Sequence, residues 1–217
     1  MATVSPEAEA VLADDASAPS PSDEATLVMH PPPGEWTIAM WAALDTREMP
    51  CELVDGCLEF LPVPKNRHHW ITHTITRLLS SRFDLMRIYE NGIKVRVFER
   101  TGRIPDVIVL DRPLAGDDME DEFLDASRVA LAVEVVSPGR RQRDRDYRDK
   151  RADYAAAGIA EYWIIDPETR LVLTLVLDGD SYRETEPVGI DGKIATPSMG
   201  EPIAVADLFP TDAGAGD

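Results

Sequence analysis

The stretch that decides the fold is Arg128-Val-Ala-Leu-Ala-Val-Glu-Val-Val136, an almost wholly apolar run with one carboxylate near its end. Such a run is typical of a central strand that is buried on both faces. Because side chains alternate along a strand, Glu134 shares a face with Ala132 and Val136. A buried carboxylate is costly without a partner, so we expect a hydrogen-bond network, a cation or a metal ion beside Glu134.

A second run, Arg103-Ile-Pro-Asp-Val-Ile-Val-Leu110, also carries an acid beside apolar residues. Asp106 shares a face with Ile108, and Pro105 before it cannot donate to a strand ladder. If the two strands pair, Asp106 and Glu134 converge in one cleft, where repulsion raises a pKa unless a cation lies between them. Oxygen ligands of this kind favour a hard ion such as Mg²⁺ or Mn²⁺.

The segment after the first strand is strongly basic, with seven Lys or Arg against three Asp in residues 140–151. It predicts a polar helix over residues 143–157. Tyr147, Lys150 and Tyr154 follow the i, i+3, i+7 spacing of one helical face. That face could place the ammonium group of Lys150 beside the two carboxylates.

The remaining pattern predicts an α/β or α+β domain, built around one mixed sheet with flanking helices. Asp55-Gly56 between two short apolar runs predicts a β-hairpin over residues 51–61, in which Glu52 is a further acid among apolar neighbours. Two more helices are predicted at residues 37–44 and 68–86, and further strands at 93–98, 104–110, 161–165 and 171–177.

Composition divides the chain into one domain and two tails. Residues 1–35 contain seven acids and no Lys or Arg, and they are rich in Ala, Pro and Ser, which predicts a disordered acidic tail. Residues 36–210 are expected to form a single domain, and residues 211–217 a frayed end. Residues 111–125, with seven acids against one base, are expected to form a solvated loop.

The charge of the whole chain restricts its partners. The 22 Lys and Arg against 40 Asp and Glu give a formal net charge of −18, a field that repels a polyanion. Nucleic-acid chemistry would therefore need a local basic patch, a metal ion or both. Cys51 and Cys57 match no zinc or redox spacing. Because the sequence shows no membrane span and no signal peptide, we expect a cytoplasmic protein without a membrane partner.

Taken together, these motifs resemble a known family. Pro105-Asp106 followed by Glu134-Val135-Val136 resembles the PD-(D/E)XK nuclease superfamily. The full series resembles the Uma-two family of restriction endonucleases over roughly residues 36–210, and it implies a restriction-endonuclease-like core. The series consists of Glu52-Leu-Val-Asp-Gly56, His69, Pro105-Asp106, Val133-Glu-Val-Val-Ser-Pro138, Asp146-x-x-x-Lys150-x-x-x-Tyr154 and Glu161-Tyr-Trp-Ile-Ile-Asp-Pro167.

The resemblance implies a metal-dependent endonuclease that hydrolyses the phosphodiester bonds of DNA through a metal-activated water. Mg²⁺ or Mn²⁺ would be held by Asp106, Glu134 and the carbonyl group of Val135. The superfamily's lysine two residues after the acid is Val136 in this chain. The resemblance implies that Lys150 replaces it, orienting or helping to deprotonate the attacking water and offsetting phosphate charge.

The resemblance also implies a homodimer, because two symmetric sites would cut both strands of DNA. Glu52 is expected to support the metal site. Contacts with phosphate are expected from Arg140, Arg141 and Arg143, and His69 and Tyr154 are expected to line the site. Two alternatives stay open at this point. One is a catalytically silent binding or regulatory module with the nuclease fold, which the net charge favours. The other is a phosphodiesterase for a small substrate.

Overall fold

The computed structural model describes residues 31–45, 49–183 and 185–210. Its α-helices are α1 (Ile38–Ala42), α2 (Asn66–Leu79), α3 (Arg140–Asp144) and α4 (Lys150–Ala156). Its strands are β1 (Cys51–Val54), β2 (Cys57–Phe60), β3 (Ile88–Glu90), β4 (Val95–Phe98), β5 (Thr101–Arg103), β6 (Val107–Leu110), β7 (Leu124–Asp125), β8 (Val129–Val135), β9 (Glu161–Asp166), β10 (Leu171–Asp178), β11 (Ser181–Tyr182), β12 (Lys193–Ile194) and β13 (Ile203–Ala204). Within these ranges, no helix combines the length and apolar character needed to cross a membrane.

The strands are divided between two larger sheets, where the sequence predicted one. The first has the order β2-β1-β5-β4-β7 and the second the order β11-β10-β9-β8-β6-β3, while β12 and β13 form a small third sheet. The predicted hairpin at Asp55-Gly56 joins β1 to β2, and β1 continues the first sheet by pairing with β5. In the second sheet β8 is antiparallel to β6 and parallel to β9, so the predicted mixed α/β class is confirmed.

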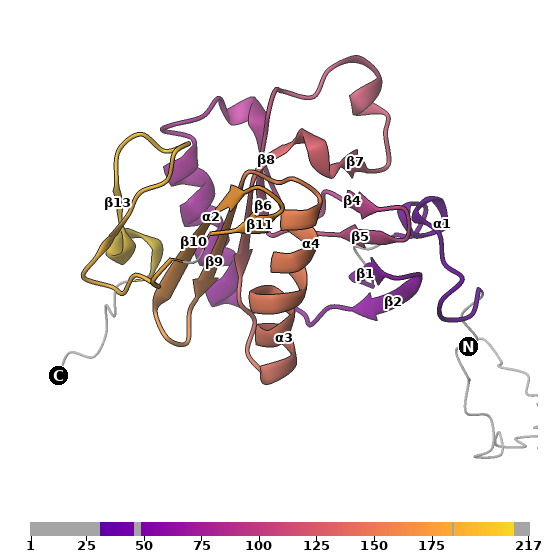
Figure 1. Cartoon of the computed structure of the whole chain (residues 1–217), viewed down its shortest axis with the longest axis horizontal. Helices are drawn as coiled ribbons and strands as arrows, with labels where there is room; N and C mark the ends of the chain where they lie inside the picture. Colours follow the sequence, from indigo (N-terminus) through magenta and orange to yellow (C-terminus); the bar gives the residue numbers. More distant parts are fainter. Residues whose placement is uncertain (1–30, 46–48, 184, 211–217) are drawn as a thin grey trace, which may run out of the picture. The chain divides into compact units, whose positions relative to one another are not determined.

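The second sheet is covered on both faces, which explains why β8 is so apolar (Figure 1). On one face Val133 of β8 belongs to a core that includes Ile71 and Ile75 of α2. On the other face Ala132 belongs to a core that includes Tyr154 of α4. Glu134 follows the alternation of the strand and therefore lies on the α4 face.

Two of the predicted helices differ in length from the observed ones. Helix α2 ends at Leu79, because the hydroxyl groups of Ser80 and Ser81 donate to the carbonyl groups of Arg77 and Leu78 and so compete with the helical ladder. The predicted polar helix begins earlier, at Arg140, and a π-helical turn interrupts it at residues 145–149, between α3 and α4.

The predicted tails fall mostly outside the described part of the chain. Residues 1–30 and 211–217 lie beyond it. Within residues 31–35, the backbone N–H of Gly34 donates to the carbonyl group of Gly56 at 2.8 Å. The predicted acidic loop at 111–125 is joined to the sheet by Arg128, whose guanidinium group pairs with Asp111 at 2.9 Å and Asp118 at 2.8 Å.

Candidate active site

The pairing of β6 with β8 brings the two predicted acids together. Val107 lies opposite Val133, so the next pair in the same register is Asp106 opposite Glu134. Residues directly opposite each other share a face, with Cβ atoms about 4.5–5.5 Å apart. Both residues line one pocket of about 540 Å³. The convergence predicted from the two strands is therefore present in the structure.

Backbone groups of Val135 also face this pocket. Pro105, which lines the pocket just before β6, has no N–H to donate to the strand ladder. The N–H of Val135 donates to Oδ2 of Asp106 at 2.7 Å. The carbonyl group of Val135 points to the same edge of the strand, and the residue lines the pocket. This carbonyl oxygen thus faces the pocket without a ladder donor from Pro105.

Lys150 joins two buried glutamates. Its Nζ lies 2.8 Å from Oε1 of Glu52 and 2.8 Å from Oε1 of Glu134. The hydroxyl group of Tyr154 donates to the same Oε1 of Glu134 at 2.8 Å. All four residues are at most 2% exposed. The partners expected beside Glu134 are therefore a cation and a hydrogen-bond donor, both supplied by α4.

The two glutamates have opposite electrostatic surroundings. Burial alone would raise the pKa of Glu52, but Lys150 and Arg103 lower it to about 2. Arg103 donates to Oε2 of Glu52 at 3.0 Å, and the N–H of Ile104 donates to Oε1 at 3.0 Å. Burial is the largest influence on the pKa of Glu134; together with the charges of Asp106, Asp146 and Glu52 it outweighs the lowering by Lys150 and raises this pKa to about 8. Glu52 does not line the pocket, whereas Glu134 does.

His69, which the sequence suggested as a site-lining residue, lines the pocket and is exposed. His68, which the sequence analysis did not name, is the histidine that contacts Asp106, with its Nε2 3.1 Å from Oδ2. Burial lowers the pKa of His68, but the hydrogen bond and the charge of Asp106 raise it overall. The sequence contained the necessary signal. Ile71 and Ile75 are buried and lie at i+3 and i+7 from His68, so His68 shares their inward face.

The π-helical turn changes which residues of the basic helix face inward. Asp146, Lys150 and Tyr154 are buried. Tyr147, which was predicted to share the face of Lys150 and Tyr154, is half-buried, and its hydroxyl group donates to Asp166 at 3.4 Å. A π-turn contains one more residue than an α-turn, which shifts the phase of the residues around it. The uniform 3.6-residue period assumed for the sequence therefore failed at this turn.

The three arginines predicted to contact phosphate are not among the residues that line the pocket. The side chains of Arg140 and Arg141 are 95% and 79% exposed. Arg143 forms an ion pair with Asp166 and lies over the ring of Tyr147. Arg145, which the sequence analysis did not single out, lines the pocket instead.

The pocket offers oxygen ligands but no complete cage of side chains. In the described ranges, no three His, Cys, Asp or Glu side chains gather so that they could hold a metal ion. The available donors are the carboxylates of Asp106 and Glu134 and the carbonyl oxygen of Val135. Two carboxylates with one carbonyl and water suit Mg²⁺, which is usually bound through one or two carboxylates and keeps several waters. The donor set therefore fits the expected ion.

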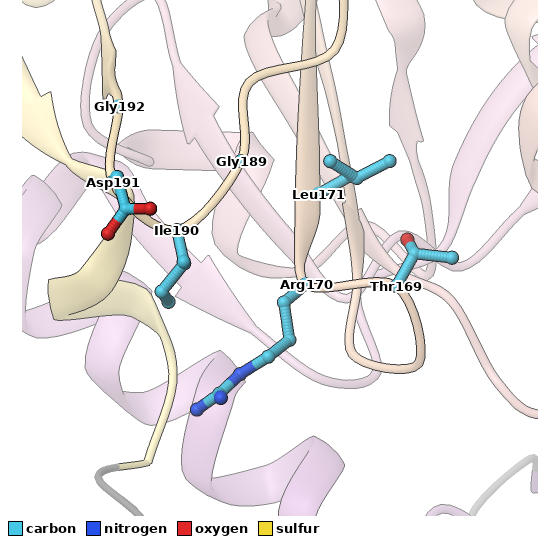
Figure 2. A pocket seen from close by; sticks show the side chains of 7 residues that line it. All are labelled: Thr169, Arg170, Leu171, Gly189, Ile190, Asp191 and Gly192. Carbon is cyan, nitrogen blue, oxygen red and sulfur yellow. The ribbon is translucent and has the colours of Figure 1, made fainter.

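A separate hollow of about 440 Å³ lies between the β9–β10 turn and the loop before β12 (Figure 2). Its lining comes from residues 169–171 and 189–192. None of the predicted site residues contributes to it, and Arg170 and Asp191 are its only charged lining residues. We therefore place the candidate site in the pocket that Asp106 and Glu134 share.

Comparison with known proteins identifies the family and the fold. The model of the Uma2 family, described as "Putative restriction endonuclease", matches residues 39–207. The chain belongs to the Uma2 family. A crystal structure described as a "putative nuclease" from Anabaena variabilis is similar to it, with a TM-score of 0.63 and 20% identity, covering 80% of this chain and 97% of that one. This similarity supports the fold of the Uma2 chain. No curated protein matches the sequence.

Proposed function

We propose that this Uma2 protein is a metal-dependent DNA endonuclease that hydrolyses phosphodiester bonds. The observation that carries the proposal is that Asp106, just before β6, and Glu134, near the end of the paired strand β8, line one pocket. Membership of a family described as restriction endonucleases supports the choice of DNA as substrate.

Asp106, Glu134 and the carbonyl oxygen of Val135 would hold Mg²⁺ or Mn²⁺. When bound, such an ion supplies Lewis-acid stabilisation of charge on a phosphoryl oxygen and lowers the pKa of water. Lys150 lines the same pocket, so its ammonium group can orient a water molecule and offset phosphate charge. Glu52 would act through Lys150, because its oxygens are occupied by Lys150, Arg103 and the N–H of Ile104.

The pocket has an approach for a long polyanion. It adjoins a second hollow of about 720 Å³, and the two share Pro62, Val63, His68 and Ser137 in their linings. Lys65 and Arg67 line this second hollow together with the acids Asp166 and Glu168, and the two bases would contact phosphates directly against the net charge of −18. Arg140 and Arg141 remain candidates for contacts with flanking phosphates, as does Arg143 if it leaves Asp166. A homodimer with two such sites would cut both strands.

The test is nicking of supercoiled plasmid in Mn²⁺ or Mg²⁺. We expect wild type to nick, Asp106→Asn to lose activity and Asp117→Asn, which changes an exposed acid of the acidic loop, to behave as wild type. Mn²⁺ should also raise the Tm of wild type and leave that of Asp106→Asn unchanged, because an ion that binds the folded state stabilises it. Nicking by Asp106→Asn at the wild-type rate would contradict the proposal.

A catalytically silent binding module is the second candidate. The net charge of −18 favours it, as does the lack of three metal-ligating side chains among the described residues. Wild type that neither nicks plasmid nor responds to Mn²⁺ would support this module. Hydrolysis of a chromogenic phosphodiester without cleavage of DNA would instead support an enzyme for a small substrate.

A further inference from the structure

We propose that Arg145 binds the substrate phosphate in this pocket and that the buried carboxylate of Asp146 holds Arg145 in place. The proposal deepens the proposed function and rests on it. It gives the binding of the phosphodiester to an arginine inside the pocket and not only to the arginines of α3.

Arg145 is a cation inside the pocket whose hydrogen-bonding capacity is largely unused. Its side chain is 14% exposed, and it lines the pocket together with Glu134 and Lys150. Nε donates to Oδ1 of Asp146 at 3.1 Å. Among the described residues this is the side-chain hydrogen bond that the guanidinium group makes, and the charges of Glu52 and Glu134 also act on it. A guanidinium group held through Nε still presents the terminal N–H groups that bind phosphate in a bidentate manner.

Asp146 has few explanations other than positioning Arg145. The residue is 1% exposed, and its Oδ2 is buried without a hydrogen-bond partner in the structure. A buried carboxylate with an unpartnered oxygen is unfavourable for stability alone. Its one side-chain hydrogen bond to another described residue goes to Arg145, which the carboxylate thereby directs. Both residues lie on the π-helical turn, a feature that is frequent at functional sites.

The other arginines of this segment are less suited to contact the scissile phosphate. Arg140 and Arg141 reach their acidic partners only at 3.7 Å and 3.8 Å and are exposed. Phosphate contacts from such positions are screened by solvent and salt. Arg145 lies in a partly desolvated pocket beside the proposed metal ligand Glu134, where a charge-assisted hydrogen bond is stronger.

The experiment measures binding of fluorescein-labelled duplex DNA by anisotropy, with Ca²⁺ replacing Mg²⁺ to suppress cleavage. We expect Arg145→Gln to bind about tenfold more weakly than wild type or worse, since a charge-assisted bidentate contact is lost. Arg145→Lys should fall between them, because it keeps the charge and loses the fork. The matched control Arg148→Gln, at an exposed arginine of the same segment that pairs with Asp149, should bind as wild type. Equal affinity of Arg145→Gln and wild type overturns the inference.

Asp146 is tested by the contrast between two variants. Asp146→Asn keeps an oxygen that can accept from Nε of Arg145, so it should retain most of the affinity and the KM of wild type. Asp146→Ala should raise KM for plasmid as Arg145→Gln does. If Asp146→Ala lowers the Tm and leaves KM unchanged, the positioning role is overturned and Asp146 is structural.

The two proposals fail in different ways. If wild type nicks plasmid and Arg145→Gln has the same KM and kcat, only the role of Arg145 is overturned. If folded wild type neither binds nor nicks DNA, the proposed function is overturned, and the inference falls with it. Melting curves of each variant confirm that the comparison is made between folded proteins.

Discussion

The ammonium group of Lys150 contacts Glu52 in the protein interior (the interior end) and Glu134 in the pocket (the pocket end), each at 2.8 Å. The surroundings of the two glutamates differ. At the interior end, Glu52 is also bound by Arg103 and by the N–H of Ile104, and its pKa is lowered to about 2. At the pocket end, Glu134 has only Tyr154 as a further donor and lies opposite Asp106, and its pKa is raised to about 8.

This difference separates a structural glutamate from a candidate metal ligand. The charge of Glu52 is neutralised by Lys150 and Arg103, so a metal ion at the interior end would add little stabilisation. At the pocket end, burial and the neighbouring acids disfavour the charged form of Glu134 despite the contact with Lys150. A divalent cation there would relieve the repulsion between Asp106 and Glu134 and lower the pKa of Glu134. These two carboxylates in one pocket are thus what makes it a candidate metal site.

Removal of Lys150 should have the largest effect on stability. Lys150→Met leaves both glutamates without their shared cation, and breaking a buried ion pair in this way costs about 3–5 kcal/mol. Glu134 can respond by remaining protonated, so we expect most of the loss to arise at Glu52. Urea denaturation measures the change in the free energy of unfolding. Lys193→Met, at an exposed lysine of β12, is the matched control, and an equal effect of the two variants would refute the shared-cation network.

The two glutamates should respond differently to the same substitution. At pH 6, Glu52→Gln should lower the free energy of unfolding by about 3 kcal/mol, because Arg103 then loses its buried carboxylate partner. Glu134→Gln should change it by about 1 kcal/mol or less, since the neutral form is already favoured at Glu134. Glu59→Gln, which lies opposite Glu52 in the hairpin, is the control. A larger loss for Glu134→Gln than for Glu52→Gln would reverse the comparison.

The dependence of stability on pH should have opposite signs at the two ends. A carboxyl group with a raised pKa stabilises the fold most at low pH, so the contribution of Glu134 falls as pH rises from about 4.5 to about 8. The contribution of Glu52 is present above pH 4.5 and falls as pH drops towards 2. Urea denaturation of metal-free protein should give a lower free energy of unfolding at pH 8 than at pH 5, at about 1.4 kcal/mol for each unit by which the pKa of Glu134 is raised. Glu134→Gln should abolish this loss, and an unchanged slope in the variant would contradict it.

The sequence predicted the pocket because the pocket depends on local alternation. Strand periodicity placed Glu134 on one face of β8, and Pro105 marked the point just before β6 begins, so pairing of the strands was enough to bring Asp106 close to Glu134. The position of Lys150 followed the family resemblance and is confirmed by its contacts. Patterns of this kind can be predicted from the sequence because each depends on a few neighbouring residues.

The parts that the sequence missed depend on long-range contacts or on irregular backbone. Arg103 reaches Glu52 from a different strand, and no local pattern indicates that pair. Arg145 lies on the π-helical turn and lines the pocket, and the sequence pattern did not indicate this irregular turn. The division into two sheets followed from the pairing of β1 with β5, which the hairpin signal alone does not specify.

Substitution of Tyr154 should change stability the least, and it tests the surroundings of Glu134 alone. Tyr154→Phe removes the hydroxyl donor to Oε1 of Glu134 and keeps the ring packed between the sheet and α4. We expect a loss of about 1 kcal/mol, the net value of one hydrogen bond. Because Glu134 then loses a donor that favours its charged form, its pKa should rise further, and Mn²⁺ should bind more weakly at pH 7. Titration calorimetry with Mn²⁺ measures this affinity, and Tyr182→Phe, whose hydroxyl group donates to the carbonyl of Ile159, controls for the loss of a buried tyrosine hydroxyl. Unchanged Mn²⁺ affinity in Tyr154→Phe would mean that Lys150 alone sets the charge of Glu134.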